Sequence, residues 1–379
     1  MSKKSDDRKN VVVVGGGYAG FNLARELSGK LDASKYNLIL ITSKPYFVHL
    51  IAGIRLTVTS EGKLEDRALM PYDKLFLNGN GTHVIGTVQS IEEKESGKGG
   101  AVLLSNGEKI DYHVLALATG SKWRGALNFP DTDEEIHAHI EGWRKRFSAA
   151  KNVIIVGGGA VGIETAGEIK HFYPGTKVTI VHAGSALLND TYPAKFRKDI
   201  QRRANLAGID VVLDEYIDEI PEAGQIGVST RSGKKFPDAD LVLPTSGGTP
   251  NTDFIATLDS NVLTSKGTVK VKPSLEVEGH PGVYALGDII EWDEQKQAAK
   301  APYHSGVAAA NILSYLSGQP QKKQYKTAME GIFIPIGPLG GGGYLGILWG
   351  IVVGDWVVRL LKSNDLFISM FRPQLGLSK

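Results

Sequence analysis

The chain has 379 residues, 42% of them hydrophobic and 22% charged, which is the composition of a folded protein large enough for two or three domains. Its 43 basic and 41 acidic residues leave a net charge of +2. The longest basic stretch, Arg144 to Arg146, is short, so nucleic acid is not an expected partner. The chain contains no cysteine, which excludes disulfides, thiolate metal sites and dithiol redox relays.

The beginning of the chain offers no targeting signal. Its first nine residues lack the apolar core of a secretion signal, and Ser2 stands where N-myristoylation requires glycine. We therefore expect neither export nor an N-terminal lipid.

The first predicted element is an apolar strand over residues 11–14, which runs into a glycine-rich turn and a helix. The spacing of Gly15, Gly17 and Gly20 is that of a dinucleotide fingerprint, in which glycines permit a tight turn, close approach to a pyrophosphate and close helix packing. The turn also includes Tyr18 and Ala19, and the anion is expected at the positive end of the new helix.

A second strand is predicted over residues 37–42. Fingerprints of this kind usually place an acidic residue after this strand to bind ribose hydroxyls, but here the sequence is Thr42-Ser43-Lys44. We expect the Thr42 hydroxyl to take part of that contact. Further on, an apolar strand over residues 115–118 ends at Thr119 and Gly120, which we expect to close the first half of this domain.

A second glycine-rich turn follows an apolar strand over residues 153–156. Gly157, Gly159 and Gly162 repeat the fingerprint spacing, so two nucleotides face each other in one chain, as hydride transfer from nicotinamide to flavin requires. The strand over residues 177–181 is followed by His182 rather than an acid. No carboxylate repels a 2′-phosphate there, so NADPH is expected to be accepted beside NADH, although His182 is also compatible with an ordinary strand end.

The chain then returns to its first domain. A strand over residues 282–286 leads to Gly287 and Asp288, whose carboxylate is expected to accept hydrogen bonds from the ribityl chain of a flavin. Pro302 and Tyr303 then open a helix of small residues that continues to Leu316. The positive end of that helix would suit an anionic reduced flavin.

Residues 331–354 form an uncharged segment of membrane-spanning length. Pro335, Pro338 and the run Gly340 to Gly343 break any continuous helix, so we expect a strand, a glycine turn, a second strand and a helix from about Gly354 to Lys362. Trp349 lies in this segment and is read either as core or as facing an acceptor. The dispersed histidines show no metal-ligand spacing, and no metal is expected.

Together these motifs resemble the pyridine nucleotide–disulfide reductase superfamily in its cysteine-free branch, and are most similar to the apoptosis-inducing-factor-like, or ferroptosis suppressor, family. The resemblance covers nearly the whole chain. Its superfamily-wide motifs are residues 15–20, 118–121, 156–164 and 284–288, and its more specific ones are His182 and residues 358–367.

The resemblance implies FAD in the first unit and NADH or NADPH in the second. It also implies that Glu164 lies at the flavin–nicotinamide junction, and that Lys362 is a lysine near the active site. Their alternatives are a helix-capping glutamate and a solvated helix-surface lysine. Phe367 and Trp349 are expected to face the acceptor.

The resulting fold class is α/β, with two doubly wound dinucleotide-binding domains, the second inserted in the first, plus a small α+β C-terminal domain. The expected FAD-binding parts are residues 1–125 and 263–325, the NAD(P)-binding domain is 126–262, and the acceptor domain is 326–379. Reduction of a hydrophobic quinone by NAD(P)H is the leading function. A ferredoxin-type reductase and an NADH-sensing signalling flavoprotein are the alternatives.

The expected location is cytoplasmic. An exposed apolar face on the C-terminal segment would allow peripheral contact with a lipid surface, such as the mitochondrial outer membrane or lipid droplets. The oligomeric state is left open.

Overall fold

A computed structural model describes residues 7–222 and 224–378 of the chain. Its first sheet has five parallel strands in the order β18-β9-β1-β2-β5. Their bounds are β1 Lys9–Val14, β2 Tyr36–Thr42, β5 Thr82–Ile85, β9 Val114–Leu117 and β18 Val283–Ala285. Because β18 comes from a segment far beyond the others, the chain leaves this domain, builds a second one and returns, as the predicted fold class requires.

The centre of this sheet is apolar throughout. The four valines 11–14 on β1 are at most 4% exposed, because α1 (Tyr18–Ser28) and β8 (Lys109–Tyr112) both contact this strand. Helix α7 (Ala301–Leu316) packs against α1. Smaller elements complete the domain. Strands β3 Tyr46–Val48 and β4 Leu69–Pro71 pair with each other, and α2 Leu50–Val58 and α3 Glu65–Ala68 lie between these two strands in the sequence. An antiparallel sheet is formed by β6 Val88–Glu93, β7 Gly100–Leu104 and β8.

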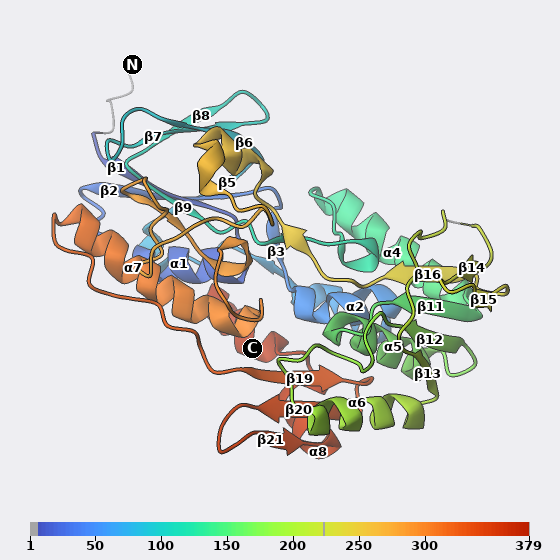
Figure 1. The fold of residues 1–379 in the computed structure, drawn as a ribbon. Coiled ribbons are helices and arrows are strands. Elements are labelled where there is room, and N and C mark those ends of the chain that lie inside the picture. The colour runs from blue at the N-terminus through green and yellow to red at the C-terminus, as the bar shows by residue number, and fades with distance from the viewer. Residues whose placement is uncertain (1–6, 223, 379) are drawn as a thin grey trace.

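The second domain has four parallel strands in the order β13-β12-β11-β16. They are β11 Asn152–Val156, β12 Lys177–Val181, β13 Ile209–Val212 and β16 Leu241–Pro244, accompanied by α4 Asp133–Ala149, α5 Ala160–Phe172 and α6 Ala194–Leu206 and by the short pair β14 Val228–Ser229 and β15 Lys235–Phe236. The two crossings between the domains, β10 Ser121–Lys122 and β17 Thr249–Pro250, pair with each other. Figure 1 shows this domain at the right of the first.

The C-terminal domain is a three-stranded antiparallel sheet with short helices. It contains β19 Gly331–Pro335, β20 Gly341–Leu345 and β21 Ile351–Val353, followed by α8 Asp355–Val358, a π-helical turn Arg359–Ser363 and α9 Ile368–Phe371. It lies at the bottom of the view in Figure 1, against α5 and α6. The helix predicted from Gly354 to Lys362 is confirmed to within a residue at each end.

The glycine turn predicted in this domain is wrong in part. Gly341, Gly342 and Gly343 form strand β20, and the turn before it ends at Gly340. A side chain on Gly342 would run into Ile200 of α6, and one on Gly343 into Phe333 of the neighbouring strand. Glycine is therefore used here for close packing of α6 on the sheet, and the third strand, β21, was not foreseen.

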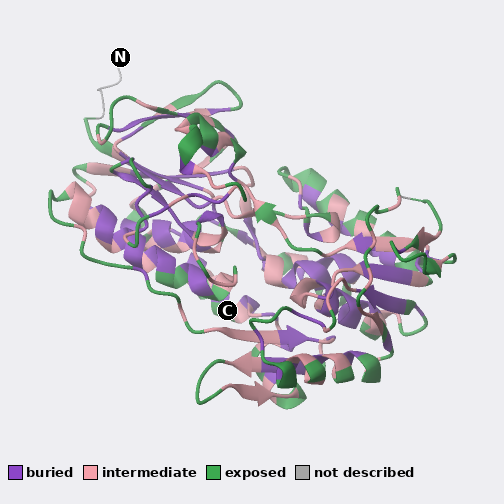
Figure 2. Cartoon of the chain, in the orientation of Figure 1, coloured by how far each residue is buried: buried purple, intermediate pink, exposed green. Residues whose placement is uncertain are grey.

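The buried residues follow the two parallel sheets and the helix faces that cover them, while the outer loops are exposed (Figure 2). Within the described residues, no helix is long and apolar enough to cross a membrane.

Candidate active site

The first glycine turn forms a cradle of backbone amides. Gly17 caps the amino end of α1 without any side-chain cap, and a Cβ placed on it would meet no atom within 4 Å. Gly15 has a φ of 103°, and a Cβ on Gly20 would overlap the carbonyl oxygen of Gly15. The turn therefore needs glycine at two places for its own geometry and leaves the third open toward a ligand, as the pyrophosphate of FAD requires.

The second turn repeats this arrangement at the start of α5. Gly157 has a φ of 125°, and a Cβ on Gly162 would overlap the carbonyl oxygen of Gly157. Gly159 is the uncapped N-cap residue and has open space beside it. The second domain thus offers a matching anion site for the pyrophosphate of NADH or NADPH.

The predicted flavin residues Gly287 and Asp288 come one residue after β18, at the carboxyl end of the first sheet. Gly287 has a φ of 81° and packs against Ala19 of α1, so the structure brings these two predicted residues together. The Ser121 hydroxyl donates to Oδ2 of Asp288 over 2.9 Å. No other hydrogen bond from the described residues reaches this carboxylate, so it retains acceptor capacity for a ligand hydroxyl.

Thr119 and Gly120 lie at the crossing to the second domain. The Thr119 hydroxyl donates to the carbonyl of Asn251 over 2.6 Å, and the Asn251 amide donates to the carbonyl of Gly120 over 2.8 Å. Both residues therefore hold the two crossing segments together. Any contact that they make with FAD stays a prediction.

Thr42 is buried and its hydroxyl already has partners. It donates to the carbonyl of Lys44 over 2.6 Å and lies 2.7 Å from Nε2 of His83. A ribose hydroxyl would have to share this oxygen with His83, so the Thr42 contact also stays a prediction.

Glu164 and Lys362 form an ion pair across two domains. Lys362 Nζ in the π-helical turn lies 2.8 Å from Oε1 of Glu164 on α5 and donates to the carbonyl of Phe333 over 2.9 Å. Their side chains are 12% and 11% exposed, respectively. Burial raises the pKa of Glu164 above its usual value, although the charge of Lys362 opposes that shift. Two residues predicted separately thus form one buried, charged unit.

A second buried ion pair, one helical turn further along α5, was not predicted from the sequence. Arg55 on α2 makes a bidentate contact with Glu168, one turn after Glu164 on α5, at 2.9 and 2.8 Å. The same guanidinium donates to the carbonyls of Ser363 and Asn364, directly after Lys362. Arg55 and Glu168 are 5% and 2% exposed. This Arg55–Glu168 clamp fixes the position of Lys362 by holding the two residues that follow it. The only sequence signal was an arginine inside an otherwise apolar helix.

Tyr18 is also tied to the C-terminal domain, through the fully buried His49. The Nε2 of His49 donates to the carbonyl of Leu366 over 2.7 Å, so its Nδ1, at 3.1 Å, accepts the hydrogen of the Tyr18 hydroxyl. Burial lowers the pKa of His49 to about 4, which keeps the ring neutral near pH 7. His49 was not predicted as a site residue.

His182 supports the second glycine turn. Its Nδ1 accepts the amide hydrogen of Gly158 over 3.1 Å, and a side chain on Gly158 would run into the imidazole. Burial lowers the pKa of His182, so the ring is held in the neutral form that accepts this hydrogen bond. The residue stands where an acid would contact an adenosine ribose.

The remaining predicted residues range from half-buried to fully exposed. Pro302 and Tyr303 are exposed in the first turn of α7, and Phe367 is half-buried with a left-handed φ of 64°. Trp349 is fully exposed in the loop between β20 and β21. No contact in the described residues joins Trp349 to Glu164 or Lys362, so its role toward an acceptor stays a prediction.

Residues 9–308 match the family described as pyridine nucleotide-disulphide oxidoreductase. The chain belongs to this family. It is 45% identical over 324 residues to the FAD-dependent oxidoreductase FVFD30 of Flammulina velutipes, a match that covers 86% of this chain and all of that protein. It is 30% identical over 368 residues to mouse ferroptosis suppressor protein 1, with 95% of this chain and 94% of that protein covered.

A solved structure shows the same fold at lower identity. The sulfide:quinone oxidoreductase of Aquifex aeolicus superposes with a TM-score of 0.78 and 16% identity, over 97% of this chain and 91% of that one. Membership of the pyridine nucleotide-disulphide oxidoreductase family confirms the resemblance and the cofactors predicted from the sequence: FAD, with NADH or NADPH as electron donor. The two glycine cradles fit both nucleotides.

Proposed function

We propose that this oxidoreductase uses FAD to transfer two electrons from NADH or NADPH to a hydrophobic quinone. The observation that carries this proposal is the buried Glu164–Lys362 pair, which joins the helix of the nucleotide cradle to the C-terminal domain. The chain contains no cysteine, so no dithiol can take electrons from the flavin. The acceptor must therefore approach the flavin itself.

Bound FAD would supply the redox chemistry, which is the uptake of a hydride from the donor and the release of electrons to the acceptor. The residues of the chain orient the two reactants. The glycine cradles would bind the pyrophosphates, and Glu164, on the helix that begins at the second cradle, would orient the nicotinamide end of the donor. Lys362 holds a positive charge beside Glu164, and with FAD bound this charge would favour the negatively charged reduced flavin.

The quinone class is supported by hydrophobicity and by likeness of fold. The A. aeolicus protein of the same fold is named for a quinone acceptor. The C-terminal domain carries exposed apolar side chains at Leu348, Trp349, Trp356 and Leu360, each at least 67% exposed. We propose that these side chains contact a lipid surface that faces the cytoplasm, because hydrophobic quinones reside in lipid.

Stopped-flow absorbance of the flavin band tests the redox proposal. The protein is mixed with NADH or NADPH and then with a short-chain ubiquinone. Rapid bleaching followed by rapid return of the band upon quinone addition is the expected result. A reduced complex that persists for minutes in the presence of quinone would instead identify an NADH sensor.

Glu164→Gln is the first variant, and it should slow flavin reduction by about tenfold or more. Glu26→Gln is its matched control, because Glu26 forms a more exposed pair with Lys30, over 2.7 Å, near the end of α1 that points away from the first cradle. Equal rates for the two variants would remove Glu164 from the site.

A further inference from the structure

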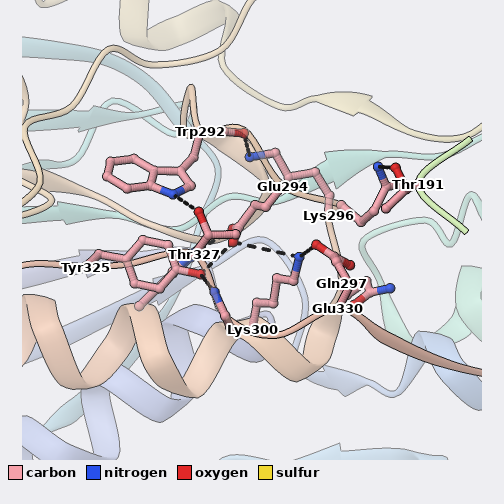
Figure 3. Close-up of polar contacts among 12 residues, drawn as sticks. Thr191, Trp292, Glu294, Lys296, Gln297, Lys300, Tyr325, Thr327 and Glu330 are labelled. Atoms are coloured by element: carbon pink, nitrogen blue, oxygen red, sulfur yellow. Dashed lines mark hydrogen bonds and ion pairs between the residues drawn. The ribbon is translucent and has the colours of Figure 1, made fainter. Parts of the chain in front are cut away.

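The segment between Asp288 and α7 connects all three domains. Gln295 exchanges hydrogen bonds with Asn189 and Thr191 of the second domain, at 2.9 and 3.0 Å, and Gln297 donates to the hydroxyl of Tyr192 over 3.0 Å. At the centre of this segment lies the side chain of Glu294, which is 1% exposed (Figure 3). A buried carboxylate needs compensating partners, and their identity shows what it does.

Three groups surround Glu294. The hydroxyl of Tyr325 donates to its Oε2 over 2.5 Å, Lys300 Nζ lies 3.8 Å from the same oxygen, and Nε2 of His304 lies 3.0 Å from Oε1. Burial acts to raise the pKa of Glu294, but the contacts with His304 and Tyr325 outweigh it, so its pKa lies below the usual value. Glu294 is therefore a fixed negative charge. Lys300 itself is paired with Glu330 at the start of the C-terminal domain (Figure 3).

His304 links this charge to the flavin turn. Its Nδ1 accepts the backbone amide hydrogen of Gly287 over 3.0 Å. A backbone amide can only donate, so Nδ1 carries no hydrogen, and Nε2 must carry the proton that faces Glu294. The ring N–H is poorly aligned with Oε1, which makes this contact a dipole–charge interaction rather than a linear hydrogen bond. The ring of Tyr325 packs edge-to-face against the imidazole, with 4.2 Å between the two ring centroids, and holds it in place.

The amide that His304 holds determines where Asp288 points. Gly287 has a left-handed φ of 81°, so the peptide before it is turned out of the β18 ladder and toward the imidazole. Asp288 is the next residue, and its carboxylate is anchored within the described residues by Ser121 alone. A shift of the Gly287 amide would therefore move the carboxylate that awaits the ligand.

We propose that Glu294 and His304 are positioning residues for the flavin: Glu294 orients the neutral imidazole of His304, and His304 fixes the Gly287–Asp288 turn that holds FAD. The Glu294 carboxylate also keeps one negative charge on the side of His304 away from the Gly287 amide. Glu294 and His304 together therefore set both the rate at which FAD leaves and the midpoint potential of the bound flavin. The inference rests on FAD binding and is independent of the acceptor.

The test uses the FAD-loaded protein, and neither readout requires turnover. FAD release is followed by the increase in flavin fluorescence after dilution, and the midpoint potential by equilibration with a reference dye. His304→Gln can still reach toward Glu294 but loses the acceptor at the Nδ1 position, and it should release FAD about tenfold faster. His304→Asn places an amide oxygen near the Nδ1 position and should release FAD more slowly than His304→Gln does.

Glu294→Gln tests the charge. It keeps the shape of the side chain but removes the negative charge, so the reduced flavin becomes more stable and the midpoint potential becomes more positive. A merely structural role for Glu294 would not produce that shift.

His280→Gln is the matched control, because His280 forms the same kind of pair with Glu93, over 2.7 Å, before the amino end of β18. It should leave both FAD release and midpoint potential unchanged. Wild-type FAD release in His304→Gln, or a wild-type potential in Glu294→Gln, would overturn the proposal. Equal acceleration of FAD release in His304→Gln, His304→Asn and His280→Gln would do so as well, since it would reflect general loss of stability.

Discussion

The two glycine turns of this oxidoreductase have the same backbone geometry but different side-chain surroundings. Each has one positive-φ glycine, one glycine in open space and one that lies against a carbonyl oxygen. The helix after the first turn begins with Tyr18, whose hydroxyl is bound by a neutral histidine. The helix after the second turn carries Glu164 and Glu168, each paired with a cation.

This difference teaches that the cradle and the chemistry are separate features. Backbone and glycine provide the anion site in both domains. The side chains on the following helix, and their partners in the C-terminal segment from Lys362 to Leu366, differ between the two cradles. Four sets of variants would break or sharpen this comparison.

The largest effect is expected from a methyl group at the tightest position of each cradle. Gly20→Ala and Gly162→Ala each drive a Cβ into a carbonyl oxygen of the same turn. Gly20→Ala should abolish FAD retention, while Gly162→Ala should keep FAD and weaken NADH binding by more than about tenfold. Flavin absorbance per protein and NADH titration measure the two effects. Gly142→Ala in α4, where a Cβ has open space, is the control and should keep both ligands.

The next largest effect is expected from the Arg55–Glu168 clamp. Arg55→Met leaves Glu168 buried without its cation, which should cost about 3–5 kcal/mol of unfolding free energy in thermal or denaturant melts. It should also slow reoxidation by quinone, because the segment that carries Lys362 loses its anchor. Arg231→Met removes an exposed pair with Asp218 and should change neither quantity appreciably. Similar melts for both variants would show that the clamp contributes little.

The Glu164–Lys362 pair gives a prediction about pH. Burial raises the folded-state pKa of Glu164 above its unfolded value. As the pH rises from the unfolded pKa to the folded pKa, the ionisation of this carboxyl group therefore lowers the free energy of unfolding. Lys362→Met removes the charge that opposes the shift. If ionised Glu164 is needed for flavin reduction by NADH, the acidic limb of the pH profile should move to higher pH. Lys30→Met is the control and should leave the pH profile unchanged. If the acidic limb of the profile does not move in Lys362→Met, ionisation of Glu164 does not control the rate of flavin reduction.

The smallest effect concerns the choice of donor. His182→Asp keeps an acceptor for the Gly158 amide but adds a negative charge where a 2′-phosphate would lie. The KM for NADPH should rise by about tenfold while that for NADH changes little. His182→Gln adds no charge and is the control. Equal KM changes for both donors would place the adenosine ribose elsewhere.

The sequence predicted what depends on local spacing. Glycine positions, the Gly287–Asp288 turn after an apolar strand and the inserted second domain all follow from short motifs in a recognisable order. The Arg55–Glu168 clamp could not be found in this way, because its members are 113 residues apart and Arg55 lies in an apolar helix. The contact between His49 and Leu366 spans 317 residues.

The glycine run of the C-terminal domain shows a different limit. A run of four glycines is the usual signal of a turn, since glycine weakens a strand. Here the approach of α6 and of neighbouring strands makes glycine necessary within a strand. Only tertiary packing distinguishes the two uses, and no local pattern reports it.

The clamp also implies an order of assembly during synthesis. Arg55 and Glu168 have both left the ribosome long before Ser363 and Asn364, the residues whose carbonyls complete the coordination of the guanidinium. The two nucleotide domains can therefore bring Arg55 and Glu168 together before the segment after Lys362 completes the coordination of the arginine. A chain cut before residue 363 lacks Lys362 or its anchor or both, so the charged Glu164–Lys362 pair depends on the C-terminal domain.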